Sequence, residues 1–358
     1  MSVAVRNTSA NTLTAGKLPK GAPWGLLIVS WLIFIGVFAL LQASGTTTDF
    51  NVVGAFFFGT ILFDILIVVI SMVVEGGRKA KDRLVTSLVT TAFIITLLPL
   101  ISLIYTVISR GVARFDSAYF NESMRNVIGA GGGAVHAIVG TLEVTAFAAL
   151  ISIPIGLLTS IYLVEYGRGR LARAITFFVD VMTGIPSIVA GLFAYSLFAL
   201  FAGPSIRAGI VGSVALSVLM IPVVVRSSEE ILKIVPNELR EASYALGVPK
   251  WLTIVKIILP TSIAGLTTGV MLAISRVIGE TAPLLITTGF TTSMNYDLFS
   301  DRMMTLPVFV YTQYANQGPD ATPFLERAWT GALVLILIVM ALNLLARLIG
   351  RLFSPKLR

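Results

Sequence analysis

The sequence contains no cysteine and a single histidine, His136. The first absence excludes disulfides, thiolate metal sites and cysteine nucleophiles, and the second excludes a metal site built on a pair of histidines. Charged residues are also scarce: they make up 12% of the 358 residues, about half of the roughly 25% found in an ordinary soluble domain. A chain with so few charges does not have the surface of a water-soluble protein.

Hydrophobic residues are abundant instead, at 56% of the chain. They fall in blocks of about 20, the length of helix that crosses a hydrocarbon core ~30 Å thick. The sequence therefore predicts an all-α polytopic membrane protein with about eight transmembrane helices. Several stretches are longer than one crossing and contain Pro or Gly, so tilts or breaks are expected there. The eight stretches are roughly Trp24–Leu41, Val52–Val74, Ser87–Ile108, His136–Val164, Ala174–Phe201, Ala208–Val225, Ile254–Ile286 and Trp329–Ala346.

The distribution of Lys and Arg predicts the orientation of these spans. With the N-terminus in the cytoplasm, 19 of the 26 basic residues lie inside, six lie outside, and Arg276 falls within an apolar stretch. Such a bias is the positive-inside pattern, so both termini are expected in the cytoplasm and the chain in the plasma (inner) membrane. Residues 1–20 are polar and without periodicity, which predicts a disordered cytoplasmic tail.

The longest cytoplasmic connection contains a short predicted helix, Glu238–Leu246. Asn237 is a good N-cap residue, Gly247 suits the left-handed position after a helix, and Pro249 cannot continue it. So short a helix is marginal by itself, and its apolar stripe needs a surface to pack on. Either it caps its own helical bundle, or it inserts into a groove on a cytoplasmic partner. The stripe consists of Leu239, Ala242 and Leu246.

This connection resembles the coupling loop of ABC importer permeases. Glu241-Ala242-Ser243 is followed at fixed spacing by Gly247, Ile257 and Leu259-Pro260, and only Ser243, in place of Ala, departs from the family's signature. The resemblance implies that residues 236–260 dock into a separate ATP-binding subunit. The coupling residues would be Glu238, Leu239, Glu241, Ala242, Leu246 and Gly247.

The chain has no G-x-x-x-x-G-K-[ST] motif for nucleotide phosphates, so ATP and Mg are expected on the partner ATPase and no cofactor is expected on this chain. The glycine-rich run 129–133 lacks the lysine of such a motif and precedes a membrane helix. It is therefore interpreted as a flexible entry into the fourth span. His136, at the outer end of that span, is interpreted as a hydrogen-bonded interfacial residue.

Five ionisable residues fall within apolar stretches, where a charge costs on the order of 3 kcal/mol and usually faces the protein interior. Asp64 has no obvious partner in the sequence and is given a structural or helix-pairing role, while Glu143 and Asp180 either line a cavity or pair with Arg276. Arg276 and Glu280 are four residues apart and would share one helix face. They either form an internal ion pair, or the guanidinium grips a tetrahedral oxyanion through two parallel hydrogen bonds.

The stretch Arg276–Leu285 is similar to the corresponding stretch of phosphate ABC transporter permeases of the PstA type. Residues 154–156 and 184–189 agree with this resemblance but are also similar to the partner permease, PstC, whereas residues 306–308 favour the PstA type. The resemblance implies that Arg276 and Glu280 contact translocating phosphate. It also implies a type I importer permease core of six spans over residues 86–352, with the transmembrane domain at about 136–350, and a two-span N-terminal extension over 21–85.

The function expected from the resemblance is that of a permease subunit of an ATP-driven phosphate importer, without enzymatic activity of its own. The expected partners are a PstC-like second permease, two ATP-binding subunits, an extracytoplasmic phosphate-binding protein and membrane lipid, with no role for nucleic acid. One alternative is a permease for another oxyanion, such as sulfate or molybdate. A second is a proton-coupled secondary transporter with Glu143, Asp180 and Glu280 as a proton relay.

Overall fold

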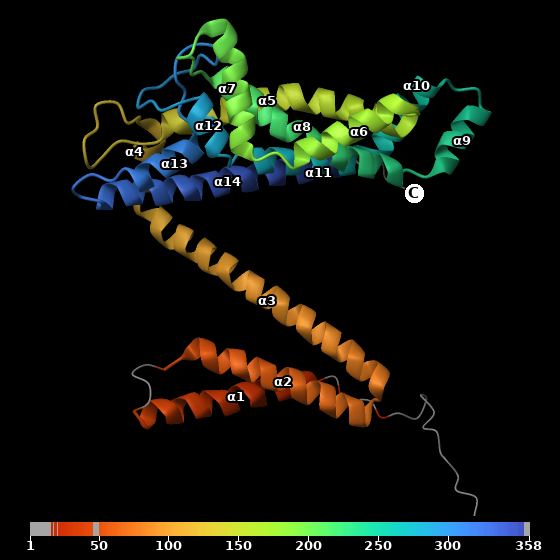
Figure 1. Cartoon of the computed structure of the whole chain (residues 1–358), viewed down its shortest axis with the longest axis vertical. Helices are drawn as coiled ribbons and strands as arrows, with labels where there is room; N and C mark the ends of the chain where they lie inside the picture. The colour runs from red at the N-terminus through yellow and green to blue at the C-terminus, as the bar shows by residue number, and fades with distance from the viewer. Residues whose placement is uncertain (1–15, 17, 20, 46–49, 354–358) are drawn as a thin grey trace, which may run out of the picture. The chain divides into compact units, whose positions relative to one another are not determined.

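The computed structural model of the chain describes residues 16, 18–19, 21–45 and 50–353. Apart from residues 16, 18 and 19, the predicted disordered tail over 1–20 lies outside them. All regular secondary structure in the described residues is helical (Figure 1), which confirms the all-α prediction. The chain divides into two compact units, Met1–Ile104 and Tyr105–Arg358, and each is described by itself.

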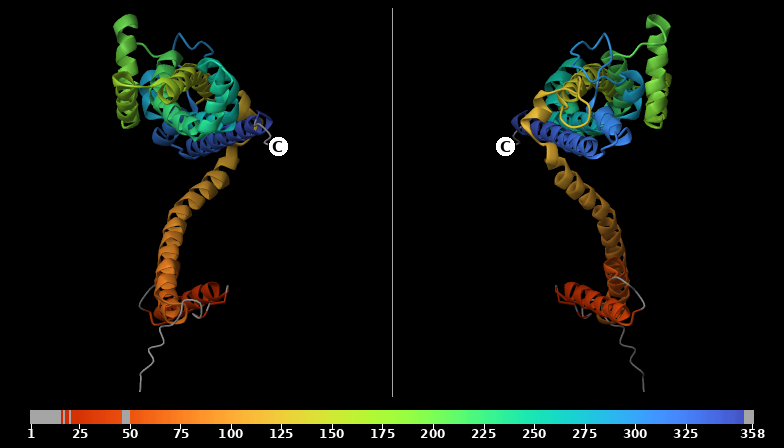
Figure 2. Two further views of the ribbon diagram at one scale, coloured as in Figure 1. Left: turned by 90° about the vertical axis from the view of Figure 1, so that its right-hand side faces the viewer. Right: turned by 90° about the vertical axis from the view of Figure 1, so that its left-hand side faces the viewer.

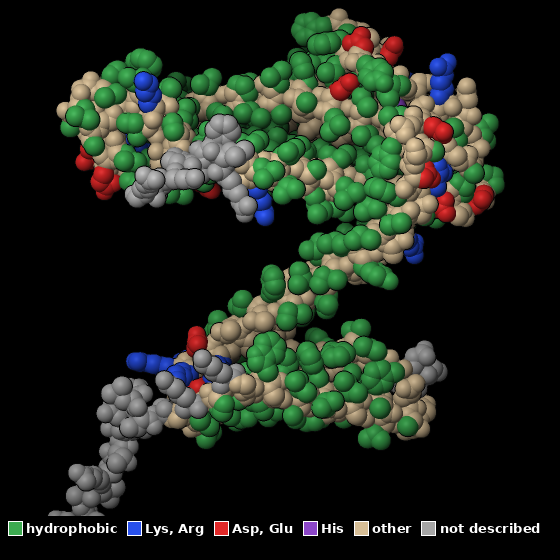
Figure 3. Space-filling view, turned by 180° about the vertical axis from the view of Figure 1, so that it is seen from behind, with side chains coloured by type: hydrophobic (Ala, Val, Ile, Leu, Met, Phe, Trp, Pro, Cys, Tyr) green, Lys and Arg blue, Asp and Glu red, His purple; other side chains and the backbone are tan. Residues whose placement is uncertain are grey.

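Seven of the described helices or helix runs are long and apolar enough to cross a membrane. The count rises to eight if the bent pair α6 and α7 forms one span, in agreement with the expected eight. The bounds of these candidate spans are Ala22–Ala43, Val52–Val74, Gly77–Arg114, Val135–Tyr166, Gly209–Ile234, Lys250–Val277 and Thr322–Gly350. In Figure 3 hydrophobic side chains cover most of the long sides of both units, and charged side chains lie mainly towards the ends. This distribution fits helices that cross a lipid bilayer.

The first unit contains α1 (Ala22–Ala43), α2 (Val52–Val74) and most of α3 (Gly77–Gly111). Helices α1 and α2 pack closely where Gly59 faces Trp31, since a Cβ on the glycine would lie 2.8 Å from Trp31 Cδ1. The indole Nε1 of Trp31 donates to Thr60 Oγ1 at 3.1 Å. A small residue at this point lets the two backbones approach, as in many membrane helix pairs.

Two polar contacts join α2 and its C-terminal end to α3. The hydroxyl of Ser87 on α3 donates to Asp64 on α2, which agrees with the structural or helix-pairing role expected for this carboxylate. At the turn between the helices, Glu75 accepts from Arg83 Nε at 2.6 Å and Nη2 at 3.0 Å. Ser71 donates to the same carboxylate at 2.9 Å. The hydrogen bonds from Arg83, opposed by burial, lower the pKa of Glu75 from 4.5 to about 2.

The second unit is organised around α8 (Gly209–Ile234), which packs along α5 (Val135–Ile161). Of the most apolar stretch of α8, 61% is buried within the unit, against 28% or less for the other candidate spans, so α8 is the central helix. Small residues bring it close to α5: a Cβ on Gly156 would lie 2.6 Å from Val224, and Ser213 Oγ donates to the Val144 carbonyl at 3.0 Å.

The remaining elements surround this pair. After α5 the chain forms a π-helical turn, η2 (Tyr162–Tyr166), and a second such turn, η3 (Ile254–Ile258), precedes α11. Such turns are rare and often lie at functional sites. The other elements are η1 (Val112–Arg114), α4 (Ser117–Asn121), α6 (Arg170–Thr183), α7 (Ser187–Ala202), α9 (Asn237–Ala245), α10 (Lys250–Thr253), α11 (Leu259–Val277), α12 (Ala282–Thr287), α13 (Leu306–Ala315) and α14 (Thr322–Phe353).

The predicted stretch 174–201 is not a straight span. The chain bends by 109° between helices α6 and α7, across the residues Gly184-Ile185-Pro186, where a break was expected. Pro186 has no N–H to continue a helix, and it disfavours helical geometry at the residue before it. Figure 2 shows α7 at the periphery of the second unit, where it contacts α8 and α12.

Candidate coupling and translocation sites

The short helix expected in the longest cytoplasmic connection is present as α9. It ends at Ala245, one residue before the predicted Leu246, but its cap is the predicted one: Gly247 has φ +74°, its N–H bonds to the Tyr244 carbonyl at 2.9 Å, and the Val248 N–H bonds to the Ser243 carbonyl at 3.2 Å. These two bonds close the helix in a Schellman-type cap, which requires a left-handed residue. The prediction for Gly247 is confirmed.

The predicted start of α9 is wrong by one residue. Asn237 is already helical, Pro236 occupies the cap position, and no side chain caps the helix. The Asn237 side chain instead accepts a hydrogen bond from Arg240 Nη1 at 3.3 Å. Pro236 favours this start because its fixed φ suits the residue at a helix boundary, and the missing N–H costs nothing there.

One face of α9 packs on its own chain and the other does not. Ser243 is buried and its hydroxyl lies 2.7 Å from that of Thr253. The predicted apolar stripe is exposed: Leu239 is 39% and Leu246 83% accessible, and Ala242 is also exposed. Within the described residues the chain does not cover this stripe. The interpretation that the stripe caps its own bundle is therefore wrong for this face.

Arg240 fastens the packed face of α9, a role that the sequence reasoning missed. Its Nε and Nη2 donate to Glu165 Oε1 at 3.0 and 2.8 Å, and both side chains are nearly buried, at 13% and 4% accessible. It also donates to the carbonyls of Val235 at 2.6 Å and Leu232 at 3.1 Å. Lys250 adds a bond to the Glu165 carbonyl. The helix is thereby tied to η2 and to the C-terminal end of α8.

Arg276 and Glu280 do not lie on one continuous helix. Helix α11 ends at Val277, and Glu280 lies in the turn before α12. Neither side chain forms an ion pair or hydrogen bond with another described residue, and Arg276 is exposed on the last turn of α11. The predicted helical pair is therefore wrong, because the i, i+4 geometry that it assumed ends between the two residues.

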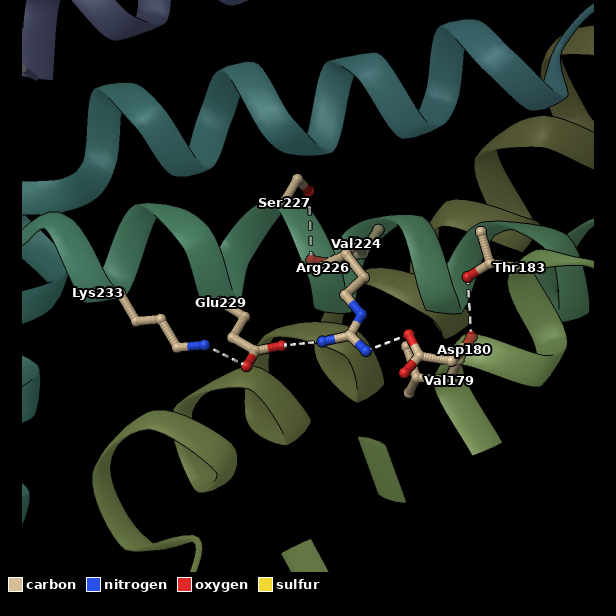
Figure 4. A network of polar contacts seen from close by, with 8 residues as sticks. All are labelled: Val179, Asp180, Thr183, Val224, Arg226, Ser227, Glu229 and Lys233. Carbon is tan, nitrogen blue, oxygen red and sulfur yellow. Dashed lines mark hydrogen bonds and ion pairs between the residues drawn. The ribbon is translucent and has the colours of Figure 1, made fainter. Parts of the chain in front are cut away.

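Asp180 pairs with Arg226 rather than with Arg276 (Figure 4). Arg226 Nη1 also donates to Glu229 at 2.9 Å, and Lys233 donates to the other oxygen of Glu229 at 2.7 Å. This chain of charges joins α6 to α8. Glu143, on α5, has one carboxylate oxygen buried without a hydrogen-bond partner among the described residues. No hydrogen bond joins any two of Glu143, Asp180 and Glu280 in that part of the chain.

The opposite end of the second unit is held by a buried arginine. Arg327 is fully buried, and its Nη1 donates to the carbonyls of Gly129 at 2.7 Å and Gly131 at 3.0 Å. Arg114 binds the Gly132 carbonyl at 2.9 Å. The glycine-rich run leads into α5 as expected, but its carbonyls are fastened by guanidinium groups, so the interpretation of a flexible entry is wrong.

Two titratable groups near this end have shifted pKa values. The pKa of Asp116 is lowered because its carboxylate accepts the backbone N–H of Tyr119 at 2.8 Å and the guanidinium of Arg114 at 3.1 Å. Burial raises the pKa of Tyr119, whose hydroxyl donates to the Arg327 carbonyl at 3.1 Å. Asp116 thus caps α4, and Tyr119 links α4 to α14.

His136 is buried, but neither ring nitrogen has a hydrogen-bond partner in the described residues. The ring packs edge-on against Phe309 at 5.6 Å between centroids. The interpretation of a hydrogen-bonded interfacial histidine is therefore wrong. The ring lines a cavity of about 200 Å³ together with residues of α13, α14 and the loops around them.

These features define a polytopic α-helical membrane protein in which an exposed amphipathic helix, α9, connects two candidate membrane spans, Gly209–Ile234 and Lys250–Val277. A profile of the binding-protein-dependent transport system inner membrane components matches residues 152–358. The chain belongs to this family.

Individual relatives give finer similarities. The chain is 46% identical to the phosphate transport system permease protein PstA 1 of Mycobacterium tuberculosis (strain CDC 1551 / Oshkosh), over 76% of this chain and 89% of that protein. It is 47% identical to the PstA permease of Mycobacterium leprae, over 75% and 88%, and 38% identical to that of Yersinia pestis, over 77% and 92%. An inward-facing structure of the MetNI methionine ABC transporter aligns with a TM-score of 0.49 and 22% identity, over 62% of this chain and 95% of that chain.

Proposed function

We propose that this chain is a permease subunit of an ATP-driven importer that translocates inorganic phosphate across the plasma (inner) membrane. The observation that carries the proposal is the 46% identity to a phosphate transport permease over 89% of its length. The six-span core over residues 86–352 performs translocation, and residues 21–85 form an extension. Both termini lie in the cytoplasm, as the distribution of Lys and Arg favours.

The exposed stripe of α9 supports a separate ATPase as the source of energy. An apolar helix face that its own chain leaves in water gains from burial in a groove of another protein. Leu239, Ala242 and Leu246 provide this face, with Glu238 and Glu241 beside it. Two ATP-binding subunits hold ATP and Mg, and this chain performs no covalent chemistry. A PstC-like permease and an extracytoplasmic phosphate-binding protein complete the importer.

Arg276 is the proposed contact for phosphate in the pathway. It is exposed on the last turn of α11 and has no carboxylate partner among the described residues, so its guanidinium is available to an anion. Glu280 follows in the break before α12. Its negative charge near the same place limits how tightly the anion is held, and weak binding is needed for release.

The test is uptake of labelled phosphate by cells that lack this chain, before and after its restoration. The proposal is supported if uptake is restored, is not reduced by excess sulfate, and is not reduced by a protonophore while the ATP concentration is maintained. Uptake that is competed by sulfate points to another oxyanion, and loss with the protonophore points to a secondary transporter. The secondary mechanism is disfavoured because Asp180 of its proposed relay is held by Arg226.

Arg276→Gln tests the site itself. It should abolish phosphate uptake while the amount of chain in the membrane stays normal, because the amide cannot form a charge-assisted bidentate contact. Arg125→Gln is the matched control, since this arginine is exposed in the loop before the glycine-rich run. Robust uptake by Arg276→Gln, or equal losses in the two variants, would remove Arg276 from the site.

A further inference from the structure

A cavity that is partly open to the surface of the second unit lies beside His136. Its volume is about 200 Å³, several times the roughly 30 Å³ share of one water molecule in the liquid. About half of the lining residues are polar: His136, Thr291, Thr292, Thr312, Gln313 and Asn316. Three phenylalanines, two methionines and a valine form the rest of the wall, and no carboxylate is among the lining residues.

A buried positive charge lies directly behind this lining. Arg327 Nε donates to Gln313 Oε1 at 2.9 Å, and its guanidinium carbon lies 4.7 Å from the ring centroid of Phe324, so two cavity residues contact it. No carboxylate of the described residues pairs with Arg327, and its Nη2 has no hydrogen-bond partner there. Carbonyl groups offset only part of a buried charge, so the cavity wall is electropositive.

The polar groups that face the cavity have unused hydrogen-bonding capacity. Both nitrogens of His136 are unpartnered within the described residues, although the side chain is only 2% exposed. Because Gln313 uses its oxygen for Arg327, its amide N–H groups are left for another acceptor. Thr292 and Asn316 provide a further hydroxyl and amide. The amide of Gln313, the hydroxyl of Thr292 and the amide of Asn316 are therefore available to a small polar ligand.

We propose that this cavity binds inorganic phosphate as a low-affinity entry site, separate from Arg276. The inference rests on the proposed function, and the cavity lies at the end of the unit that the Lys and Arg distribution places outside. Hydroxyl and amide donors bind the anion's oxygens, and Arg327 supplies attraction from behind the wall. The absence of a direct charge contact keeps binding weak enough for onward transfer. Phosphate is favoured over sulfate because its own O–H groups can donate to Asn316 Oδ1.

The test is phosphate binding to the full-length chain in lipid nanodiscs, followed by broadening of the ³¹P resonance of inorganic phosphate. Thr292→Val, which replaces a hydroxyl by a methyl group of the same size, should weaken binding about tenfold, as expected for a hydrogen bond to an anion. Thr268→Val is the matched control, since that exposed hydroxyl bonds only to its own helix at 2.9 Å. Gln313→Leu should also weaken binding, because it removes the amide N–H donors of this residue.

The same titration on Arg276→Gln distinguishes the cavity from the proposed site at Arg276. In this variant the ³¹P resonance of phosphate should broaden as it does with the unchanged chain. Binding that disappears in Arg276→Gln but is unchanged in Thr292→Val would overturn the inference, as would equal affinity for sulfate in a competition titration. Uptake measurements keep the two proposals apart. Normal phosphate uptake with no binding at the cavity would refute only the entry site, and cavity binding without any uptake would refute the proposed function.

Discussion

Breaking the ion pair between Arg240 and Glu165 should loosen α9 from the rest of the second unit. In Arg240→Met, the carboxylate of Glu165 is left 4% exposed without its cation, and two carbonyls lose their donor. Removing one partner of a buried pair costs about 3–5 kcal/mol. Local opening of α9 should therefore become at least a hundredfold more frequent, since 1.4 kcal/mol corresponds to a factor of ten.

Glu165→Gln should have a smaller effect, because the amide oxygen still accepts from Arg240 and only the charge is lost. The difference between a charged and a neutral hydrogen bond is about 1–2 kcal/mol, or roughly five- to thirtyfold in opening. The double variant, Arg240→Met with Glu165→Gln, has neither charge, so no buried charge is left without a partner. The free-energy cost of the double variant should fall below the sum of the two single costs by about 0.5–3 kcal/mol, the interaction energy of residues in contact.

The assay is hydrogen exchange of the α9 amides, followed by mass spectrometry on the chain in nanodiscs. Glu238→Gln is the control, since it removes a negative charge from the exposed side of the same helix and should change protection by less than about 0.5 kcal/mol. Strictly additive losses in the double variant, or protection in Arg240→Met no lower than in Glu238→Gln, would refute the view that this pair holds α9.

The remaining predictions concern the turn at Gly247 in the second unit and the turn at Glu75 in the first unit. Gly247→Val places a β-branched residue at φ +74°, a backbone strain of about 1–3 kcal/mol. The variant should stimulate ATP hydrolysis less in the assembled importer, while the amount of this chain in the membrane stays normal. Unchanged stimulation would contradict the coupling role. Arg83→Met should raise the pKa of Glu75 from about 2 towards 4.5, which is measurable by ¹³C NMR of labelled glutamate. Because the folded pKa is lowered, the stability from this contact is present above about pH 4.5 and is lost as the pH falls towards 2; a titration midpoint that stays near 2 in the variant would contradict this.

The features that the sequence predicted well are those carried by local composition. Val52–Val74 begins and ends where the apolar run does, because in lipid a helix is the simplest way to satisfy every backbone group. The cap at Gly247 was also predictable, since a glycine followed by a proline two residues later is a strong end signal. Such features depend on residues within one or two turns of each other.

The errors arose where a pattern was extended across a break or where the partner lies far away in the chain. The pairing of Arg276 with Glu280 assumed a continuous helix, although Pro283 signalled a boundary nearby. Arg240 and Glu165 are 75 residues apart, and no periodicity connects them. Arg327 is one of the six basic residues assigned to the outside, and no local pattern indicated its burial against glycine carbonyls 196 and 198 residues away.

The attachment of α9 bears directly on how an ATPase could move this permease. A helix joined to its neighbours only by flexible loops would yield when a partner pushed on Leu239 and Leu246. Arg240 instead binds groups at the ends of both α5 and α8, so a displacement of α9 is carried to the most closely packed helix pair of the unit. From α8 the contact of Arg226 with Asp180 continues to α6. Packed helices move as rigid bodies rather than deform. We therefore expect a displacement of the exposed stripe on α9 to move α5, α8 and α6 together, through the ion pairs of Arg240 and Arg226.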